Sequence, residues 1–368
     1  MRAWVYYNKV QPDGGHVRLE RVPVPKLSPG ELLLKVVGVS VCGTDEDLFH
    51  GKFSEVYDGI IPGHEIFGEI VGRGSNIRGF DIGQKIVAES HYQIPGYIEE
   101  GVIGLWGPKI LTGGYLRPLN GGYAEYVAIT NYCAHLVPKT LDSSDFFPSL
   151  LEGIGNDCLI AKYLFDQGLL GTVAVVGCGP HGLFTQMFLK HFGVKRLAAF
   201  EIDRKRMELA KEFGANIVFD SLAKDLDKQV SDFTAGKGFD AVIDIAGGHE
   251  TVLKTCFKYV MDRGTLVLFG LYGNEKVKLE GVPINDIIFG MRDLEVKYEN
   301  KYIHVKGITG REGIWDYLID TVAVSRKLRQ KIMKPVTVMG PLDNLGRDTL
   351  KINRKKVMKR AYTAFGTH

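Results

Sequence analysis

Cysteine is scarce in this sequence. Only five cysteines occur among 368 residues; they are scattered along the chain, and none belongs to a C-x-x-C pair. An odd, dispersed set argues against a disulfide framework and favours a reducing compartment. We therefore expect a cytoplasmic protein.

Long apolar runs and a strong net charge are also missing. No apolar stretch approaches the length of a bilayer span, and the opening residues MRAWVYYNKV do not resemble a secretory signal. The formal net charge is only +3, which gives no electrostatic reason to bind nucleic acid. We expect neither a membrane nor a nucleic acid as partner.

The chain is too long for one hydrophobic core, and its texture changes near residue 142. Before that point, β-rich runs such as ELLLKVVGVSV and GGYAEYVAI are punctuated by glycine. After it, strands such as TVAVVG alternate with helices such as HGLFTQMFLKHFG, which is typical of a doubly wound parallel sheet. We predict an α/β protein with one domain at 1–152 and 307–368 and a second at 153–306.

A dinucleotide site is indicated by VAVVGCGPHGLF, which carries Gly177, Gly179 and Gly182 as G-x-G-x-x-G. The motif follows an apolar strand and opens a helix, as the binding of a pyrophosphate at a helix N-terminus requires. Glu201 ends the next strand, where a carboxylate would accept hydrogen bonds from the ribose hydroxyls and repel a 2′-phosphate. NAD is therefore favoured over NADP.

Three basic residues keep NADP open as the less favoured alternative. Arg204, Lys205 and Arg206 follow Glu201 closely and are able to receive a phosphate, although such a run is commonly a solvated first turn of a helix.

Cys42, His64 and Glu152 are candidate metal ligands. Each follows an apolar stretch and lies close to glycine. A thiolate, an imidazole and a carboxylate suit Zn²⁺, which keeps an open position in catalytic sites. The wide spacing leaves open that each residue is merely structural.

A family resemblance connects these features. GVSVCGTD, IIPGHEIFGEIVGRGSN, GGYAEYVAI, EGIGND and VVGCGPHG occur in the order of the zinc-dependent medium-chain dehydrogenases, which include alcohol, polyol and threonine dehydrogenases. The resemblance implies a GroES-like β-rich catalytic domain, a Rossmann domain and a catalytic zinc on Cys42, His64 and Glu152. Glu65, next to His64, is implied to lie near the metal as a catalytic residue and possible ligand that replaces another ligand as water or substrate moves.

The resemblance also implies catalytic and cofactor roles. Thr44 stands at the position that hydrogen-bonds the reacting alcohol. Many relatives have a relay histidine three residues later, but this sequence has Asp47 there and its nearest histidine is His50, so the proton route stays open among these side chains and water. The residues assigned to the cofactor are Gly177, Gly179, Pro180, His181, Gly182, Glu201, Arg206, Asn156, Ala246, Phe269 and, at the C-terminal phosphate-binding position, Arg360.

One departure from the family concerns a second zinc. Most zinc members carry four close cysteines before GGYAEY, whereas this sequence has none between Cys42 and Cys133. A closed structural site needs four ligands at short spacing. We therefore predict one catalytic zinc per subunit and no structural zinc, with the lobe packed instead around four apolar and aromatic residues. These are Tyr92, Tyr97, Leu105 and Trp106.

The substrate is expected to be a secondary alcohol: a polyol, sugar, cyclitol or amino alcohol such as threonine. A polar cleft near Glu89, His91, Asn156 and Arg311 suits such molecules. The alternatives are a zinc-free NADPH-dependent quinone or enoyl reductase of the same superfamily, and a non-catalytic relative. The resemblance further implies a homodimer or homotetramer joined by sheet edges, for which TLVLFGLYG and LEVKYENKYIHV are the expected stretches.

Overall fold

The computed structural model divides the chain into two compact units. It describes residues 1–12, 14–52, 56, 58–93, 100–104, 108–110, 116–141, 146–272, 277–310, 313–351 and 357–366. Residues 1–153 and 315–368 form the first unit, and residues 154–314 form the second. In these described ranges, no helix is both long and apolar enough to cross a bilayer. The division of catalysis and cofactor binding between the predicted domains stays a prediction.

The first unit is built on a seven-stranded sheet. The strand order is β11–β5–β4–β3–β22–β21, and β10 also pairs with β3. Its elements are β1 (Arg2–Tyr6), β2 (Val17–Arg21), β3 (Glu31–Val41), α1 (Gly43–Phe49), β4 (Glu65–Arg73), β5 (Lys85–Ala88), β6 (His91–Gln93), β7 (Glu100–Val102), β8 (Pro108–Ile110), β9 (Leu116–Pro118), β10 (Tyr126–Thr130), β11 (Ala134–Leu136), α8 (Ile314–Val324), α9 (Arg326–Met333), β21 (Val336–Pro341), α10 (Leu345–Lys351) and β22 (Lys359–Thr363).

The end of β3 is where the candidate site begins. Ser40 faces Glu65 on β4, and Val41 faces Arg360 on β22, so two strands distant in sequence flank this end. Cys42 follows directly and is the N-cap residue of α1. Helix α1 is fixed to the core by buried apolar residues of its last turn, such as Leu48.

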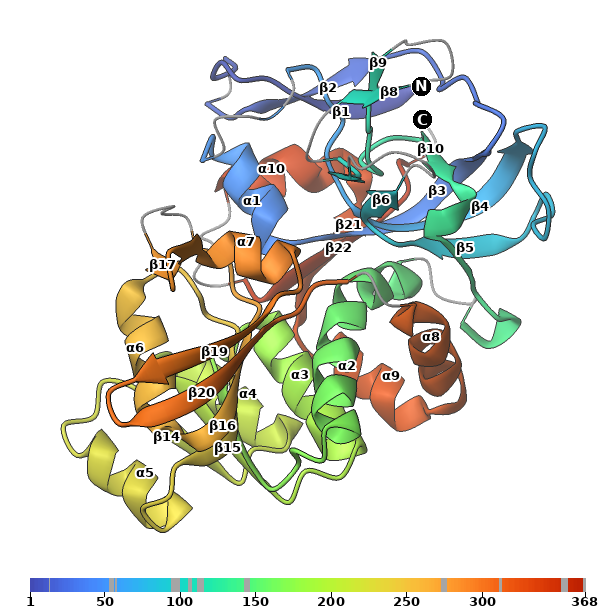
Figure 1. Cartoon of the computed structure of the whole chain (residues 1–368). Helices are drawn as coiled ribbons and strands as arrows, with labels where there is room; N and C mark the ends of the chain where they lie inside the picture. Colours follow the sequence, from blue (N-terminus) through green and yellow to red (C-terminus); the bar gives the residue numbers. More distant parts are fainter. Residues whose placement is uncertain are drawn as a thin grey trace. The chain divides into compact units, whose positions relative to one another are not determined.

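The second unit has a seven-stranded sheet in the order β14–β13–β12–β15–β16–β20–β19. All neighbours are parallel except the β19–β20 pair, and helices alternate with the strands (Figure 1). The predicted doubly wound sheet is confirmed. Its elements are α2 (Leu150–Asp166), which begins in the first unit, β12 (Thr172–Val176), α3 (Pro180–His191), β13 (Arg196–Glu201), α4 (Arg204–Phe213), β14 (Ile217–Asp220), α5 (Leu226–Thr234), β15 (Phe239–Asp244), α6 (Glu250–Tyr259), β16 (Val260–Leu268), β17 (Lys278–Leu279), β18 (Val282–Pro283), α7 (Ile284–Phe289), β19 (Asp293–Tyr298) and β20 (Lys301–Gly307).

One expectation about the sheet edge is wrong. The stretch TLVLFGLYG begins within β16, which pairs with β15 on one side and β20 on the other. Residues 264–268 of β16 are buried one after another, because a strand inside a parallel sheet is covered on both faces. The edge strand is β19, from the other stretch expected there.

Candidate active site

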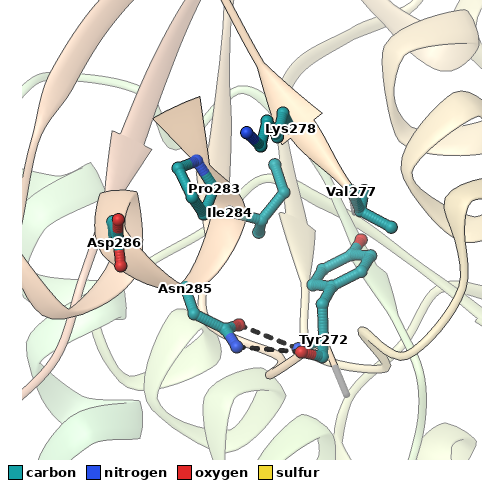
Figure 2. Close-up of a pocket in the computed structure, with 7 residues that line it drawn as sticks. All are labelled: Tyr272, Val277, Lys278, Pro283, Ile284, Asn285 and Asp286. Carbon is teal, nitrogen blue, oxygen red and sulfur yellow. Dashed lines mark hydrogen bonds between the residues drawn. The ribbon is translucent and has the colours of Figure 1, made fainter. Parts of the chain in front are cut away.

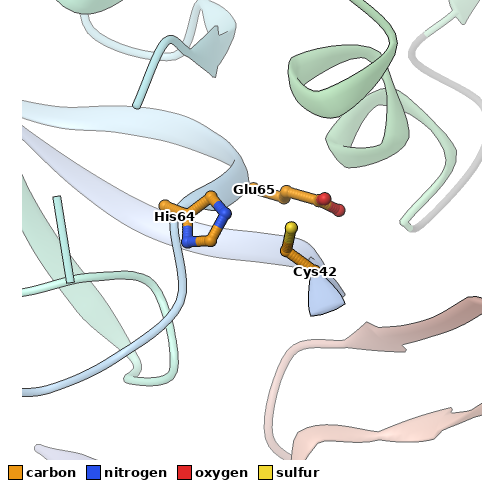
Figure 3. A group of neighbouring side chains, drawn as sticks. All are labelled: Cys42, His64 and Glu65. Atoms are coloured by element: carbon orange, nitrogen blue, oxygen red, sulfur yellow. The ribbon is translucent and has the colours of Figure 1, made fainter. Parts of the chain in front are cut away.

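Cys42, His64 and Glu65 lie together in the first unit. One ligand atom of each side chain lies within 4.8 Å of the others, and no other group of this kind occurs in the part of the chain that the structure describes. Figure 3 shows the Cys42 side chain directed toward the other two. Cys42 is half-buried, whereas His64 and Glu65 are buried. These are donors that a zinc ion accepts.

Asp45 supports this group from α1. One carboxylate oxygen, Oδ2, accepts hydrogen bonds from the backbone N–H of Cys42 (3.0 Å) and the hydroxyl of Tyr123 (2.9 Å). The other, Oδ1, lies 3.4 Å from Nδ1 of His64. A carboxylate on one ring nitrogen orients a ligand histidine and leaves Nε2 to face a metal ion.

The charges of Asp45 and His64 stabilise each other. Burial by itself raises the pKa of Asp45, but the charge of His64 and the hydrogen bonds that Asp45 accepts hold this pKa below its ordinary value. Burial by itself lowers the pKa of His64, and the Asp45 carboxylate raises it well above its ordinary value.

Glu65 is held by two donors. The Ser40 hydroxyl donates to Oε2, and Nζ of Lys359 lies 2.5 Å from Oε1. Glu65 is fully buried and Lys359 is 7% exposed. Burial lowers the pKa of Lys359, but the nearby charges of Glu65 and Cys42 outweigh burial and raise it.

Glu152 lies outside the group of three. It is buried in the first turn of α2, and its Oε1 accepts a hydrogen bond from the Ser90 backbone N–H at 3.1 Å. Its main-chain carbonyl accepts one from Nε1 of Trp315 at 3.1 Å. Burial raises the pKa of the Glu152 carboxyl to about 7 although the charge of His64 opposes this shift.

The predicted catalytic residues of α1 have different surroundings. Oγ1 of Thr44 lies 3.6 Å from the Cys42 sulfur, so Thr44 stands beside the candidate metal group. Asp47 forms an ion pair with Lys52 at 2.8 Å, and Nδ1 of the exposed His50 lies 2.6 Å from the carbonyl oxygen of Glu46. The structure therefore brings Thr44 to the group, while Asp47 and His50 have partners elsewhere.

Other predicted residues of the first unit also have partners. Arg360 is buried and forms an ion pair with Glu46. Glu89 contacts His135 at 3.3 Å. Arg311, Tyr97, Leu105, Trp106 and the side chain of Tyr92 lie outside the described residues.

The glycine turn of the second unit joins β12 to α3. Gly177 has a φ of +96°, a left-handed conformation that favours glycine. A methyl group on Gly182 would overlap the carbonyl oxygen of Gly177, whereas one on Gly179 would meet open space. Pro180 is the first residue of α3, a position that needs no N–H donor. The turn therefore has the shape that pyrophosphate binding requires.

Glu201 closes one side of this turn. Its Oε2 accepts a hydrogen bond from the Cys178 backbone N–H at 2.8 Å, and its Oε1 accepts one from Ile202 N–H at 2.8 Å. Ile202 is 61% exposed, which provides an apolar surface beside the carboxylate. Arg206 lies half-buried in the first turn of α4.

Two of the remaining cofactor candidates, Ala246 and Phe269, follow the carboxyl ends of the parallel strands β15 and β16. His181 contacts Asp157 at 3.1 Å, and its ring meets Phe269 edge-on at 5.1 Å between centroids. Ala246 lies against Gly177. Asn156 lies on α2, next to Asp157. Ligands of open α/β sheets bind at these strand ends.

A cavity of about 360 Å³ lies next to β17, β18 and α7 (Figure 2). Tyr272 and Asn285 are joined there by two hydrogen bonds of 2.9 and 2.8 Å. Its lining residues are Tyr272, Val277, Lys278, Pro283, Ile284, Asn285 and Asp286.

Comparison with known proteins decides the family. The family model described as zinc-binding dehydrogenase matches residues 180–299, and the one described as alcohol dehydrogenase GroES-like domain matches residues 28–139. The chain belongs to the zinc-dependent medium-chain dehydrogenases. It is an oxidoreductase of the alcohol dehydrogenase type, as the resemblance predicts.

Individual relatives agree with this family. The chain is 29% identical over 327 residues to the L-threonine 3-dehydrogenase of Pyrococcus abyssi, covering 87% of each chain. It shares its fold with 2R,3R-butanediol dehydrogenase of Bacillus subtilis (TM-score 0.73, 23% identity, 98% and 99% covered). A Sinorhizobium meliloti protein determined with bound NADP also has this fold (TM-score 0.75, 23% identity, 98% of each chain covered).

Sequence reasoning missed four side chains around the site. Ser40 and Lys359 contact Glu65. Asp45 contacts Cys42 and His64, and Tyr123 contacts Asp45. Asp45 carried a usable signal, because it stands three residues after Cys42, at the position where a carboxylate bonds the N-cap backbone of a helix. Tyr123 and Lys359 carried none, because their contacts depend on strands far apart in the sequence.

Proposed function

We propose that this medium-chain dehydrogenase oxidises a secondary alcohol with NAD, using one zinc ion on Cys42, His64 and Glu152. The observation that carries the proposal is the convergence of Cys42 and His64 next to Thr44, with the buried carboxyl of Glu152 near enough for the charge of His64 to affect its pKa. A thiolate, an imidazole and one carboxylate form a three-ligand set with an open position, as catalytic zinc requires. When bound, zinc supplies a Lewis acid that lowers the pKa of a coordinated alcohol.

Glu152 is the proposed third ligand. It is a buried carboxylate with a pKa raised to about 7, so its ionised form is poorly stabilised by its present contacts. A divalent cation would provide the missing stabilisation. The Ser90 N–H fixes one oxygen of Glu152, which orients the carboxylate.

Thr44 is the proposed partner of the substrate hydroxyl. Its side chain is half-exposed and lies beside the Cys42 sulfur, so its hydroxyl can accept the proton of an alcohol held at the same group. From Thr44 we propose that the proton passes to solvent by way of Asp47, His50 or water.

NAD is the proposed cofactor. The glycine turn accepts the pyrophosphate, and the ribose hydroxyls bond Glu201, whose negative charge disfavours the 2′-phosphate of NADP. The exposed side chain of Ile202 suits the apolar face of adenine. The NADP found in the Sinorhizobium meliloti protein makes the choice between the two cofactors a question for direct measurement.

The substrate class rests on the relatives. The Pyrococcus abyssi protein is named for threonine and the Bacillus subtilis protein for a diol. Both names describe a secondary alcohol beside a second polar group. We propose that this chain uses a substrate of the same kind, a polyol, sugar, cyclitol or amino alcohol, and that it works as a homodimer or homotetramer.

The deciding experiment combines metal analysis with an activity screen. The purified chain should hold about one zinc ion per subunit. Members of a panel of polyols, sugars and amino alcohols should be oxidised faster with NAD than with NADP, as followed by the absorbance of the reduced cofactor. The Cys42→Ser variant should lose turnover and zinc but retain NAD binding, measured by fluorescence titration. A zinc-free wild-type protein that reduces quinones or enones with NADPH would contradict the proposal, as would full turnover of the variant.

A further inference from the structure

His135 lies between two carboxylates in the first unit. Its Nδ1 is 2.9 Å from Oδ1 of Asp316, and its Nε2 is 3.3 Å from Oε2 of Glu89. The side chains of His135 and Glu89 are only 10% and 13% exposed, whereas that of Asp316 is 76% exposed. A neutral imidazole has a single N–H and can donate to only one of the two carboxylates. Both contacts together therefore require the protonated ring, which donates from both nitrogens.

Strand pairing and one helix bring these side chains together. Strand β11 pairs antiparallel with β5, and His135 stands opposite Val87. Glu89 follows the end of β5, two residues after Val87, which makes it a diagonal neighbour within reach of His135. Asp316 comes from the first turn of α8, 181 residues further along the chain. The preceding residue, Trp315, stacks on the imidazole with 5.6 Å between ring centroids.

The same two segments hold Glu152. Ser90, the residue after Glu89, donates its backbone N–H to Oε1 of Glu152 at 3.1 Å. Trp315, the residue before Asp316, donates its Nε1–H to the main-chain carbonyl of Glu152 at 3.1 Å. Glu152 and Trp315 are both buried. The imidazole thus joins the segment that fixes the side chain of Glu152 to the segment that fixes its main chain.

We propose that protonated His135 is a positioning residue for Glu152. This inference rests on the proposed role of Glu152 as a zinc ligand. While both carboxylates are bound to the ring, the segments that carry Ser90 and Trp315 are held together around the first turn of α2. Losing one of these contacts releases one segment, and Glu152 then keeps its orientation less well. Groups that orient a ligand in this way typically contribute about 10- to 100-fold to metal affinity.

The charges around His135 favour its protonated form. Burial by itself lowers the pKa of His135, but the hydrogen bonds and charges of Glu89 and Asp316 outweigh burial and raise it above its ordinary value. In the described part of the chain, Glu89 at the end of β5 and Asp316 on α8 are the charged groups that face the ring. The indole face of Trp315 also attracts a cation stacked on it. Both contacts are therefore made at lower pH, and one is lost as pH rises through the pKa of His135 in the folded chain.

A double-mutant cycle on zinc affinity tests the inference. Competition with a chromophoric chelator near neutral pH should give His135→Gln a zinc dissociation constant at least about tenfold above that of the wild type. In a Glu152→Gln background the same substitution should change the constant by less than about twofold, because its effect passes through Glu152. Asp316→Asn should also weaken zinc binding. The matched control is Asp320→Asn, an exposed acid on the same helix, which should leave the constant unchanged.

The pH dependence gives a readout that a purely structural role would not. NMR measures the pKa of His135 from the ring signals that are missing in His135→Gln. The ratio of the zinc dissociation constants of His135→Gln and wild type should fall toward 1 between about one pH unit below this pKa and about two units above it. The ratio falls because the wild type then loses the same contact, while the protonation of the metal ligands affects both proteins alike.

The outcomes separate this inference from the proposed function. If Glu152→Gln binds zinc as tightly as the wild type, Glu152 is not a ligand and the inference falls with that assignment. If Glu152→Gln weakens binding and His135→Gln does not, the role of His135 alone is overturned. A loss that persists in the Glu152→Gln background, or a ratio that is constant with pH, would also overturn it. If His135→Gln does not fold, the exposed Asp316→Asn carries the same cycle and pH series.

Discussion

Asp45 connects three parts of the site at the scale of a single residue. Its carboxylate receives the Cys42 backbone N–H and the Tyr123 hydroxyl and lies against His64. Fully buried carboxylates are rare unless they are paired in this way. The residue therefore fixes the thiolate and the imidazole relative to each other before any metal ion binds.

Replacing Asp45 with asparagine should weaken metal binding. The amide keeps the size of the side chain but loses the charge that orients His64, and changes of this kind typically cost about 10- to 100-fold in metal affinity. Competition with a chromophoric chelator measures the zinc dissociation constant. The control is Asp81→Asn, which removes an exposed carboxylate paired with Arg73. Equal affinity in Asp45→Asn and wild type would show that Asp45 does not orient the ligand.

At the scale of one strand–turn–helix element, the glycine turn between β12 and α3 determines whether the cofactor can bind. Gly182→Ala places a methyl group on the carbonyl oxygen of Gly177, so the turn between β12 and α3 has to shift. We expect a loss of stability of about 1–3 kcal/mol, typical of overpacking, and at least tenfold weaker NAD binding.

Gly179→Ala is the matched control for this turn. A methyl group there meets no protein atom within 4 Å, so urea unfolding should match the wild type. NAD binding should nevertheless weaken, because the cofactor's pyrophosphate approaches the backbone at this glycine. Unchanged NAD affinity in both variants, measured by isothermal titration calorimetry, would place the pyrophosphate elsewhere.

The contrast between the glycine turn and the Lys359 contact shows what the sequence could predict. The turn, α3 and Glu201 follow from local patterns, since a glycine motif after an apolar strand predicts a tight turn that leads directly into a helix. Cys42 and His64 were predicted as neighbours only through the family resemblance. Lys359 lies 294 residues from Glu65, and their contact depends on β22 pairing with β3, which no local pattern indicates. The position of Glu152 outside the close group likewise depends on how α2 packs.

At the scale of the whole molecule, one buried acid of the second unit links stability to pH. Asp244, the last residue of β15, is fully buried and accepts hydrogen bonds from the Tyr272 hydroxyl (2.5 Å) and the Gly247 N–H (2.9 Å). Burial raises the pKa of Asp244 from 3.8 to about 6, although these hydrogen bonds oppose the shift.

The direction of the pH effect follows from proton linkage. Between pH 4 and pH 6 the folded chain keeps the Asp244 proton that the unfolded chain releases, so this group's contribution to stability falls as pH rises. The full cost of ionising it in the folded state is about 3 kcal/mol above pH 6. Asp244→Asn cannot ionise, so its unfolding free energy relative to wild type should rise by up to that amount between pH 4 and pH 7.

Urea unfolding across this pH range measures the difference between the two proteins. Asp232→Asn, which removes an exposed carboxylate paired with Lys228 on α5, is the control for converting an acid to an amide, and its difference from wild type should stay within about 0.5 kcal/mol. A difference for Asp244→Asn that does not change with pH would mean that Asp244 ionises alike in the folded and unfolded chain. Asp244 is the last residue of its strand, and α/β proteins bind their ligands at such strand ends. NAD affinity should therefore be compared between wild type and Asp244→Asn over the same pH range in which Asp244 ionises.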